Sequence, residues 1–288
     1  MGMFYNAGMN GTILYRGPSN YNSEPIVVIA TGLKDGSANS KTGKLVQIYI
    51  LADHGEKPSD ALYQSGKSTS CCGDCKHDQW GTCYVNIGQG GNSVYGAYLR
   101  DRYPVYDVAE HGEVFKDKLV RFGAYGDPAM VPMSVWEPIL KQAKNHTAYT
   151  HQWNKSWASA YKSFCMASVD TQSEYSEAKS MGWRTFRVRP QTEADNKTNR
   201  AETLCPASAE ANKDVDRDEW KKCSDCMLCH GGKSKVDVVI AVHGTGYKSR
   251  RFNDIMELVN KGEAYDKLIP LKISARKHGL TTAQSGVK

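Results

Sequence analysis

Two cysteine-rich segments constrain this chain more than any other feature of its sequence. The first reads CCGDCKHDQWGTCYV over residues 71–85, and the second reads KKCSDCMLCHGG over residues 221–232. The chain has nine cysteines in all, so most of them lie in these two segments. Clustered thiols serve as disulfide partners, metal ligands or nucleophiles, and the cellular compartment largely decides among these roles.

The compartment that the sequence favours is the cytoplasm. The N-terminal residues MGMFYNAGMNGTILYRG lack the basic region and apolar core of a signal peptide. No apolar run approaches the ~20 residues of a membrane-spanning helix, so we expect no membrane partner. Disulfides are rare in the cytoplasm, and an odd number of cysteines cannot all be paired. Both clusters are therefore predicted to bind metal or to react.

Short apolar runs typical of β-strands recur along the chain and alternate in its later part with helical patterns. One such helix is expected over residues 171–182, with Thr171 as its N-cap and Gly182 as its end. Strand–helix alternation predicts a parallel sheet, and about eight units match the size of a (β/α)8 barrel. A doubly wound open sheet is the alternative. The strand candidates are residues 25–33, 44–53, 82–88, 118–127, 147–153, 164–170, 183–190 and 236–244.

We accordingly predict an α/β protein with a TIM-like barrel, formed by one domain over residues 1–288. A cysteine-rich loop is expected at 68–90, and a metal-binding insertion is expected at about 190–235, where strand–helix alternation is weakest. The second cluster has the spacing C-x17-C-x2-C-x2-C. Four thiolates can close a tetrahedral zinc site, and a CxxCxxC run is also found in iron–sulfur proteins. Structural zinc is the preferred prediction, with an iron–sulfur cluster as the alternative, and the predicted ligands are Cys205, Cys223, Cys226 and Cys229.

The first cluster, with Cys71, Cys72, Cys75 and Cys83, is less regular, so a second metal site there stays open. If zinc has four protein ligands, no coordination position remains for water, and chemistry is expected elsewhere.

The barrel hypothesis places active-site groups at the C-terminal ends of the strands. Two aspartates occupy such positions: Asp127 ends the turn GAYGDP, and Asp170 precedes a helix in ASVDTQSE. Either could instead be a turn or capping residue. We predict Asp127 and Asp170 as the catalytic pair. The substrate-binding candidates at neighbouring strand ends are Asn86, Gln89, His151, Gln152 and His243.

The formal net charge is +6, and basic residues are concentrated at the C-terminal end of the chain. Residues 243–288 contain nine lysines and arginines but only four acidic residues. A basic surface of this kind suits a polyanion such as DNA, although a solvated surface would look the same.

Four segments together resemble the phage 7-deazaguanine DNA transglycosylases (the DpdA family), distant relatives of tRNA-guanine transglycosylase. The segments are NSKTGKLVQIYIL, CCGDCKH…GTCYVNIGQG, VRFGAYGDPAMVP and ETLCPASAEA…CSDCMLCHGG. The resemblance implies a TIM barrel with structural zinc, acting in a host cell cytoplasm. It also implies exchange of guanine in DNA for a 7-deazaguanine base such as preQ0. Asp127 and Asp170 would then supply the nucleophile and the proton-transfer group.

The chain departs from the tRNA enzymes in two respects. It lacks a DSGGFQ-like motif, and its cysteine spacing differs from their CxCxxC…His pattern. Two other classes therefore stay open: an iron–sulfur enzyme with redox or radical chemistry, and a non-enzymatic zinc-dependent nucleic-acid-binding protein.

Overall fold

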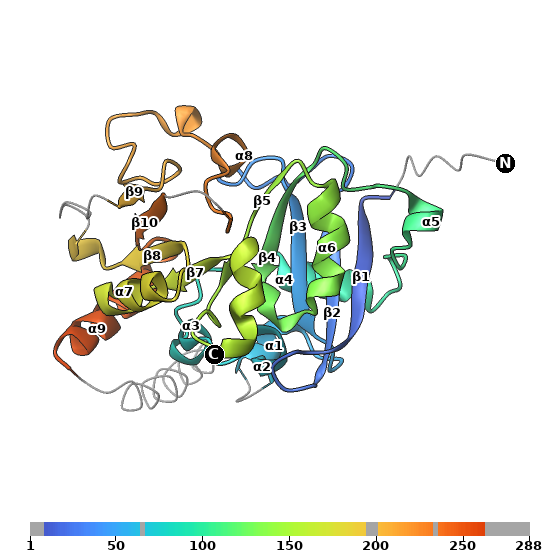
Figure 1. Cartoon of the computed structure of the whole chain (residues 1–288), viewed down its shortest axis with the longest axis horizontal. Helices are drawn as coiled ribbons and strands as arrows, with labels where there is room; N and C mark the ends of the chain where they lie inside the picture. Colours follow the sequence, from blue (N-terminus) through green and yellow to red (C-terminus); the bar gives the residue numbers. More distant parts are fainter. Residues whose placement is uncertain (1–8, 64–66, 194–200, 233–235, 263–288) are drawn as a thin grey trace, which may run out of the picture.

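A computed structural model describes residues 9–63, 67–193, 201–232 and 236–262 of the chain. Within these residues the strands form two five-stranded sheets (Figure 1). The first sheet has the order β1 (Gly11–Pro18), β2 (Pro25–Thr31), β3 (Val46–Ala52), β4 (Leu119–Tyr125) and β5 (Asn145–Thr147). The second has the order β6 (Tyr149–Thr150), β7 (Met166–Val169), β8 (Thr185–Arg189), β10 (Asp237–Ala241) and β9 (Glu202–Leu204).

One extended segment joins the two sheets. Strands β5 and β6 are separated only by Ala148; β5 pairs with β4 in the first sheet, and β6 pairs with β7 in the second. The backbone N–H of Met166 donates to the carbonyl of Ala148 at 3.0 Å, so hydrogen bonding to β7 continues across the break. The second sheet is parallel throughout, whereas in the first sheet β2 pairs antiparallel with both β1 and β3.

Burial explains why these apolar runs form strands. Strand β2 is buried at five consecutive positions, and every residue of β8 and β10 is buried. Strands covered on both faces read as continuous apolar runs, which is the pattern of β2, β3 and β10. Figure 1 shows α6 (Met133–Gln142) in front of the first sheet. Helices α1 (Pro58–Tyr63), α2 (Thr69–Cys72) and α4 (Gly91–Tyr98) contact β3.

Helix α7 (Gln172–Ser180) packs on β7 and β8, and its start follows the sequence prediction. Thr171 and Glu174 form a reciprocal capping box, and Gly182 has a φ of 80° beyond the helix. The other helices are α3 (Lys76–Trp80), α5 (Val108–His111), α8 (Cys223–Cys226) and α9 (Gly246–Asn260). The 3₁₀ helices are η1 (Pro128–Met130), η2 (Ser156–Ser163), η3 (Gln191–Glu193) and η4 (Arg217–Glu219).

The prediction of an α/β protein with parallel strands is confirmed, but the strands of the described residues do not close into a barrel. The connection from β1 to β2 is too short for a helical crossover, and the connection from β2 to β3 contains no helix, so these strands pair as antiparallel neighbours. The prediction of a strand over 82–88 was wrong, because those residues form an irregular loop that ends in a turn. Strands β1 and β9 were not predicted. The basic residues after 262 lie outside the described residues.

Among the helices that the structure describes, none has both the length and the apolar composition needed to cross a bilayer.

Candidate metal centre and carboxylate–histidine cluster

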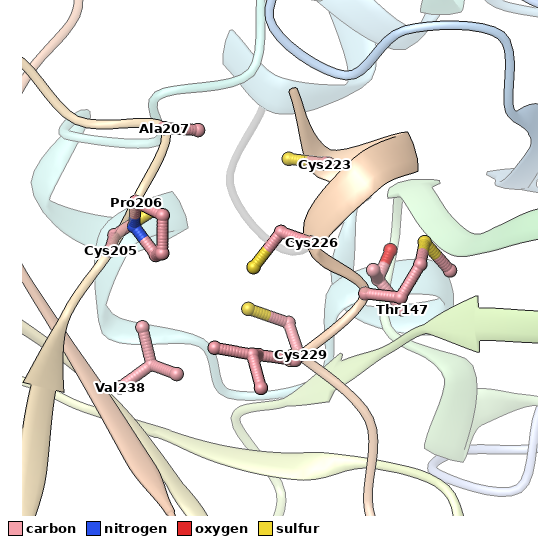
Figure 2. A pocket seen from close by; sticks show the side chains of 10 residues that line it. Thr147, Cys205, Pro206, Ala207, Cys223, Cys226, Cys229 and Val238 are labelled. Atoms are coloured by element: carbon pink, nitrogen blue, oxygen red, sulfur yellow. The ribbon is translucent and has the colours of Figure 1, made fainter. Parts of the chain in front are cut away.

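The four cysteines predicted to bind metal line one cavity, the cysteine pocket (Figure 2). Cys205 follows β9, Cys223 and Cys226 begin and end α8, and Cys229 follows that helix. In Figure 2 the sulfur atoms of Cys226 and Cys229 point toward the side on which Cys205 lies. The rest of the wall is mostly apolar, and it consists of Thr147, Pro206, Ala207, Met227, Leu228 and Val238.

The cysteine pocket is a void that protein atoms leave unfilled. Its volume is about 20 Å³, whereas a water-sized body needs roughly 10–15 Å³. Four thiols around one void form a donor set that fits zinc or an iron–sulfur cluster. In the part of the chain that the structure describes, no three His, Cys, Asp or Glu side chains are arranged to hold a metal ion. The assignment of the four ligands therefore stays a prediction.

Backbone contacts hold residues 223–230, here called the pocket segment, against both sheets. The N–H groups of Cys223 and Ser224 donate to the carbonyls of Lys41 and Thr42, at 3.1 and 3.0 Å. The N–H of Ala148, between β5 and β6, donates to the carbonyl of Cys229 at 2.9 Å. The cysteine segment therefore ties the loop before β3 to the junction of the two sheets.

The Arg184 guanidinium fixes the end of the same segment. It donates to the carbonyls of Leu228, at 3.0 Å, and of His230 and Val236. The carbonyl of Leu228 also accepts from the N–H of His230 at 3.0 Å, so the arginine adds to the backbone hydrogen bonds of this irregular segment.

Burial and mutual repulsion disfavour free thiolates in the pocket. Burial raises the pKa of the Cys229 thiol, and the other three thiols raise it further, although a hydrogen bond with Tyr149 opposes them. Burial lowers the pKa of the Lys41 ammonium, and the thiols of Cys205 and Cys223 oppose that shift. Four thiolates would repel one another here unless a metal ion compensated their charge.

Asp127 stands where β4 ends, and its carboxylate is fully engaged. Oδ1 accepts from the N–H of Ala129 at 2.9 Å, which caps η1, and Oδ2 accepts from the N–H of His151 at 2.7 Å. Burial raises the pKa of Asp127, while His151 and these hydrogen bonds oppose the rise. The residue is only 4% exposed, so it serves as a turn and cap residue in this conformation.

Asp170 follows β7 and forms ion pairs instead of capping α7. Its Oδ2 lies 2.6 Å from Lys76 Nζ and 3.0 Å from His77 Nε2. Burial alone would raise the pKa of Asp170, but His77 and Lys76 outweigh it and hold the pKa below its usual value. The cap role that the sequence allowed for Asp170 belongs to its neighbour Thr171.

Two histidines connect the aspartates. The rings of His77 and His151 meet edge to face with centroids 5.4 Å apart; His77 pairs with Asp170, and the backbone of His151 binds Asp127. Burial lowers the pKa of His151, while Asp127 and Asp170 oppose this. We call Asp127, His151, His77, Asp170 and Lys76 the carboxylate–histidine cluster.

The other substrate-binding candidates are not gathered around one site. Gln152 is fully buried and donates from Nε2 to the carbonyl of Cys72 at 3.4 Å, which places it beside the cluster. Asn86 and Gln89 are exposed in the turns that replace the expected strand. His243 lies apart, with Nε2 2.5 Å from Lys41 Nζ. Part of its ring faces solvent, but desolvation of the rest and the Lys41 ammonium lower its pKa to about 4.

Lys76 is a functional candidate that the sequence did not reveal. Its ammonium also lies 2.5 Å from Glu174 Oε1, in the first turn of α7. A lysine in a cysteine-rich loop has no sequence signal for partners so far along the chain.

Comparison with known proteins adds no further constraint: no family model matches the chain, and no curated protein or solved structure is significantly similar to it.

Proposed function

We propose that this chain is a metalloprotein whose cysteine pocket holds a thiolate-bound metal centre. The observation that carries this proposal is that Cys205, Cys223, Cys226 and Cys229 line a single unfilled cavity. Sulfur ligands select zinc, copper(I) or iron–sulfur clusters over magnesium, calcium or manganese. A zinc ion with four cysteine ligands has no open coordination position for water, which favours a structural role for the metal.

The role of the centre follows from what the pocket segment connects. Its backbone bonds reach Lys41 and Thr42 before β3 and Ala148 between the sheets. A metal bound by all four thiols would add covalent links between the edge strand β9 and helix α8. Binding free energy of a structural zinc site is also folding free energy, so we infer that the metal stabilises the join between the sheets.

Metal analysis of the purified chain tests the proposal. We expect one zinc in the pocket, lost on Cys226→Ala and retained on Cys165→Ala. Cys165 is a matched control because it is a fully buried free thiol that does not line the pocket. Iron and acid-labile sulfide in place of zinc would identify the alternative iron–sulfur centre. Retention of the full metal content by Cys226→Ala would contradict the pocket as the site.

A second candidate is the DNA guanine transglycosylase suggested by the family resemblance. Its support is the convergence of Asp127 and Asp170, from the ends of two parallel strands, around His151. Base exchange needs one carboxylate as nucleophile and another group for proton transfer. Their exposures of 4% and 2% mean that the cluster would have to open before a flipped base could reach it.

Base exchange is measured directly with duplex DNA carrying labelled guanine and excess preQ0. We expect release of guanine that depends on preQ0 and is abolished by Asp127→Asn and by Asp170→Asn in variants shown to be folded. Parallel incubation with tRNA distinguishes the two nucleic acids. No release from either, with metal-replete protein, would exclude this activity. DNA binding without release would instead indicate a zinc-dependent nucleic-acid-binding protein.

A further inference from the structure

Exposed aromatic rings gather around the turn that joins β10 to α9. Tyr247, in the first turn of α9, is 55% exposed, and Tyr84, in the cysteine-rich loop, is 40% exposed. The ring of Tyr84 lies near the exposed ring of His243, which follows β10; their centroids are 6.2 Å apart and their planes differ by 30°. Exposed rings at one turn offer faces on which a planar ligand can stack.

The ammonium of Lys41 lies beside the same histidine. Its Nζ is 2.5 Å from His243 Nε2, and His243 Nδ1 lies 3.3 Å from the carbonyl of Ala241. A carbonyl only accepts, so Nδ1 carries the ring proton and Nε2 accepts from the ammonium, whose other hydrogens stay available to an anion. The imidazole is then neutral and does not compensate the charge of Lys41.

Two more cations lie at the start of α9. The ammonium of Lys248 donates to the carbonyl of Val85, in the loop of Tyr84, at 3.1 Å. A Cβ atom placed on Gly246 would lie 3.2 Å from Nη1 of Arg250, so this guanidinium folds back over the first turn of the helix. That turn contains no acidic residue, and the N-cap side chain forms no capping hydrogen bond. The two cations therefore add to the partial positive charge of the helix N-terminus.

Acidic side chains do not compensate this charge. Glu210, near the end of β10, is paired with an arginine of β8. Asp254 is the first acidic residue of α9 and lies one turn beyond Arg250. Within the described residues, no ion pair links a carboxylate to Lys41, Lys248 or Arg250. The turn therefore carries net positive charge beside exposed aromatic rings.

We propose that this turn is a binding surface for single-stranded nucleic acid. The aromatic–basic surface, as we call it, consists of Lys41, Tyr84, His243, Tyr247, Lys248 and Arg250. Phosphate groups contact the cations, and unpaired bases stack on the tyrosine rings. A duplex hides the faces of its bases within the stack, so exposed rings select a single strand. The inference rests on the second candidate function, to which it assigns a binding surface, but binding itself does not require base exchange.

The loop that carries Tyr84 also reaches the carboxylate–histidine cluster. Thr82 Oγ1 lies 2.8 Å from His77 Nδ1, two positions before the exposed tyrosine. Phe252 of α9 stacks on the ring of His77, with centroids 5.9 Å apart and planes that differ by 19°. Both elements that form the aromatic–basic surface thus contact His77 with their buried sides. A strand held on this surface would lie next to the cluster.

Fluorescence anisotropy of a labelled oligothymidylate with the full, metal-replete chain tests the proposal. Tyr247→Ala should weaken binding about five-fold or more, because it removes one stacking platform. Arg250→Gln should reduce the slope of log K against log salt by about 0.7, the value for one phosphate contact on a single strand. Lys41 is left unchanged, because its carbonyl also holds the pocket segment.

The matched controls are Tyr21→Ala and Lys116→Gln. Tyr21 is 37% exposed in the turn between β1 and β2, and the side chain of Lys116 is 67% exposed. Lys116 follows α5, which lies at the opposite end of the molecule from α9 (Figure 1). Both controls should bind like the wild type. Circular dichroism and the metal content of each variant verify that it is folded.

Four outcomes overturn the proposal: no binding of the oligonucleotide, wild-type binding by both surface variants, equal losses in the controls, or equal affinity for a duplex of the same sequence. A single-stranded RNA of matching sequence distinguishes the two nucleic acids. Binding that depends on the surface, without release of guanine, would remove the transglycosylase and keep this inference. Guanine release that persists at the wild-type rate in both surface variants would keep the transglycosylase and remove the surface.

Cross-linking of the wild-type protein needs no variant. A bromouracil-substituted oligonucleotide is irradiated in the complex, and mass spectrometry identifies the attached peptides. We expect cross-links to the peptides that contain Tyr84 or Tyr247. Cross-links confined to other peptides would overturn the proposal.

Discussion

The ammonium of Lys76 lies 2.6 Å from Asp170 Oδ2, although the aspartate side chain is only 1% exposed. This ion pair joins α3, in the cysteine-rich segment, to the end of β7 in the second sheet. Glu174 accepts from the same ammonium and also binds the N–H of Asp170 at 2.8 Å. The lysine is therefore shared by two carboxylates that lie on one turn of chain.

Replacing Lys76 with methionine should destabilise the fold strongly. Removing one partner of a buried ion pair typically costs about 3–5 kcal/mol, because the other charge stays buried. Urea denaturation of Lys76→Met measures the change in the free energy of unfolding. The matched control is Lys116→Met, since Lys116 pairs with Glu113 at an exposed position and should contribute about 0–1 kcal/mol. Equal losses in the free energy of unfolding for the two variants would contradict the structural role of Lys76.

The stability of the protein should fall in acid through Asp170. Its folded-state pKa lies below the usual value of about 3.9. As the pH falls, the unfolded state therefore binds the proton before the folded state does. The contribution of Asp170 to folding stability is full above pH ~4 and is lost as the pH falls below it. Asp170→Asn should be less stable at neutral pH and should show a flatter dependence in that acid range. The free energy of unfolding at several pH values, measured for both proteins, tests this; parallel curves would refute it.

Gly126 should not tolerate a side chain. Its φ is 80°, and a Cβ atom would lie 2.4 Å from the carbonyl oxygen of Ile50. Gly126→Ala should therefore cost more than the ~1 kcal/mol of left-handed backbone strain alone. Gly55→Ala supplies the comparison, because Gly55 has a φ of 78° and nothing within 4 Å of the added atom. Similar melting temperatures for the two variants would mean that the turn before Asp127 can move.

Arg184→Met should loosen the end of the pocket segment. The change removes the guanidinium donor from the carbonyls of Leu228, His230 and Val236, at about 1–3 kcal/mol for each that is left buried and unsatisfied. The carbonyl of Leu228 keeps the N–H of His230 as a donor. We expect faster labelling of Cys229, which is 8% exposed in the structure, by a thiol reagent. Cys165, fully buried in the core cluster that reaches from the first sheet to β7, reports on global unfolding. Acceleration at both cysteines alike would indicate general destabilisation instead.

Long apolar runs were the most predictable part of the fold. Strands β2, β3 and β10 are nearly continuous stretches of Val, Ile and Leu, and burial on both faces is what produces that composition. Strand β9 has only three residues, and β1 is partly exposed, so neither has a distinctive pattern. Residues 82–88 have the apolar alternation of a strand, but none of the strands that the structure describes pairs with them.

Those parts of the candidate sites were predictable in which strand order or cysteine spacing alone brings the residues together. Asp127 and Asp170 follow parallel strands, so their convergence could be expected, and cysteine spacing placed Cys205 with the CxxCxxC run. The hydrogen bonds and ion pairs that each side chain forms could not be predicted. Whether Asp170 caps a helix or pairs with Lys76 depends on tertiary contacts that sequence periodicity does not encode.

The hydrogen bond from Cys223 to the carbonyl of Lys41 joins two segments that are synthesised at different times. A nascent chain presents Lys41 and Thr42 long before the ribosome has made α8, and domains fold from the N-terminal side first. The first sheet can therefore form while the pocket does not yet exist. The four thiols can line the cysteine pocket only after the chain has been made as far as Cys229, so the loop before β3 lacks these hydrogen-bond partners until then.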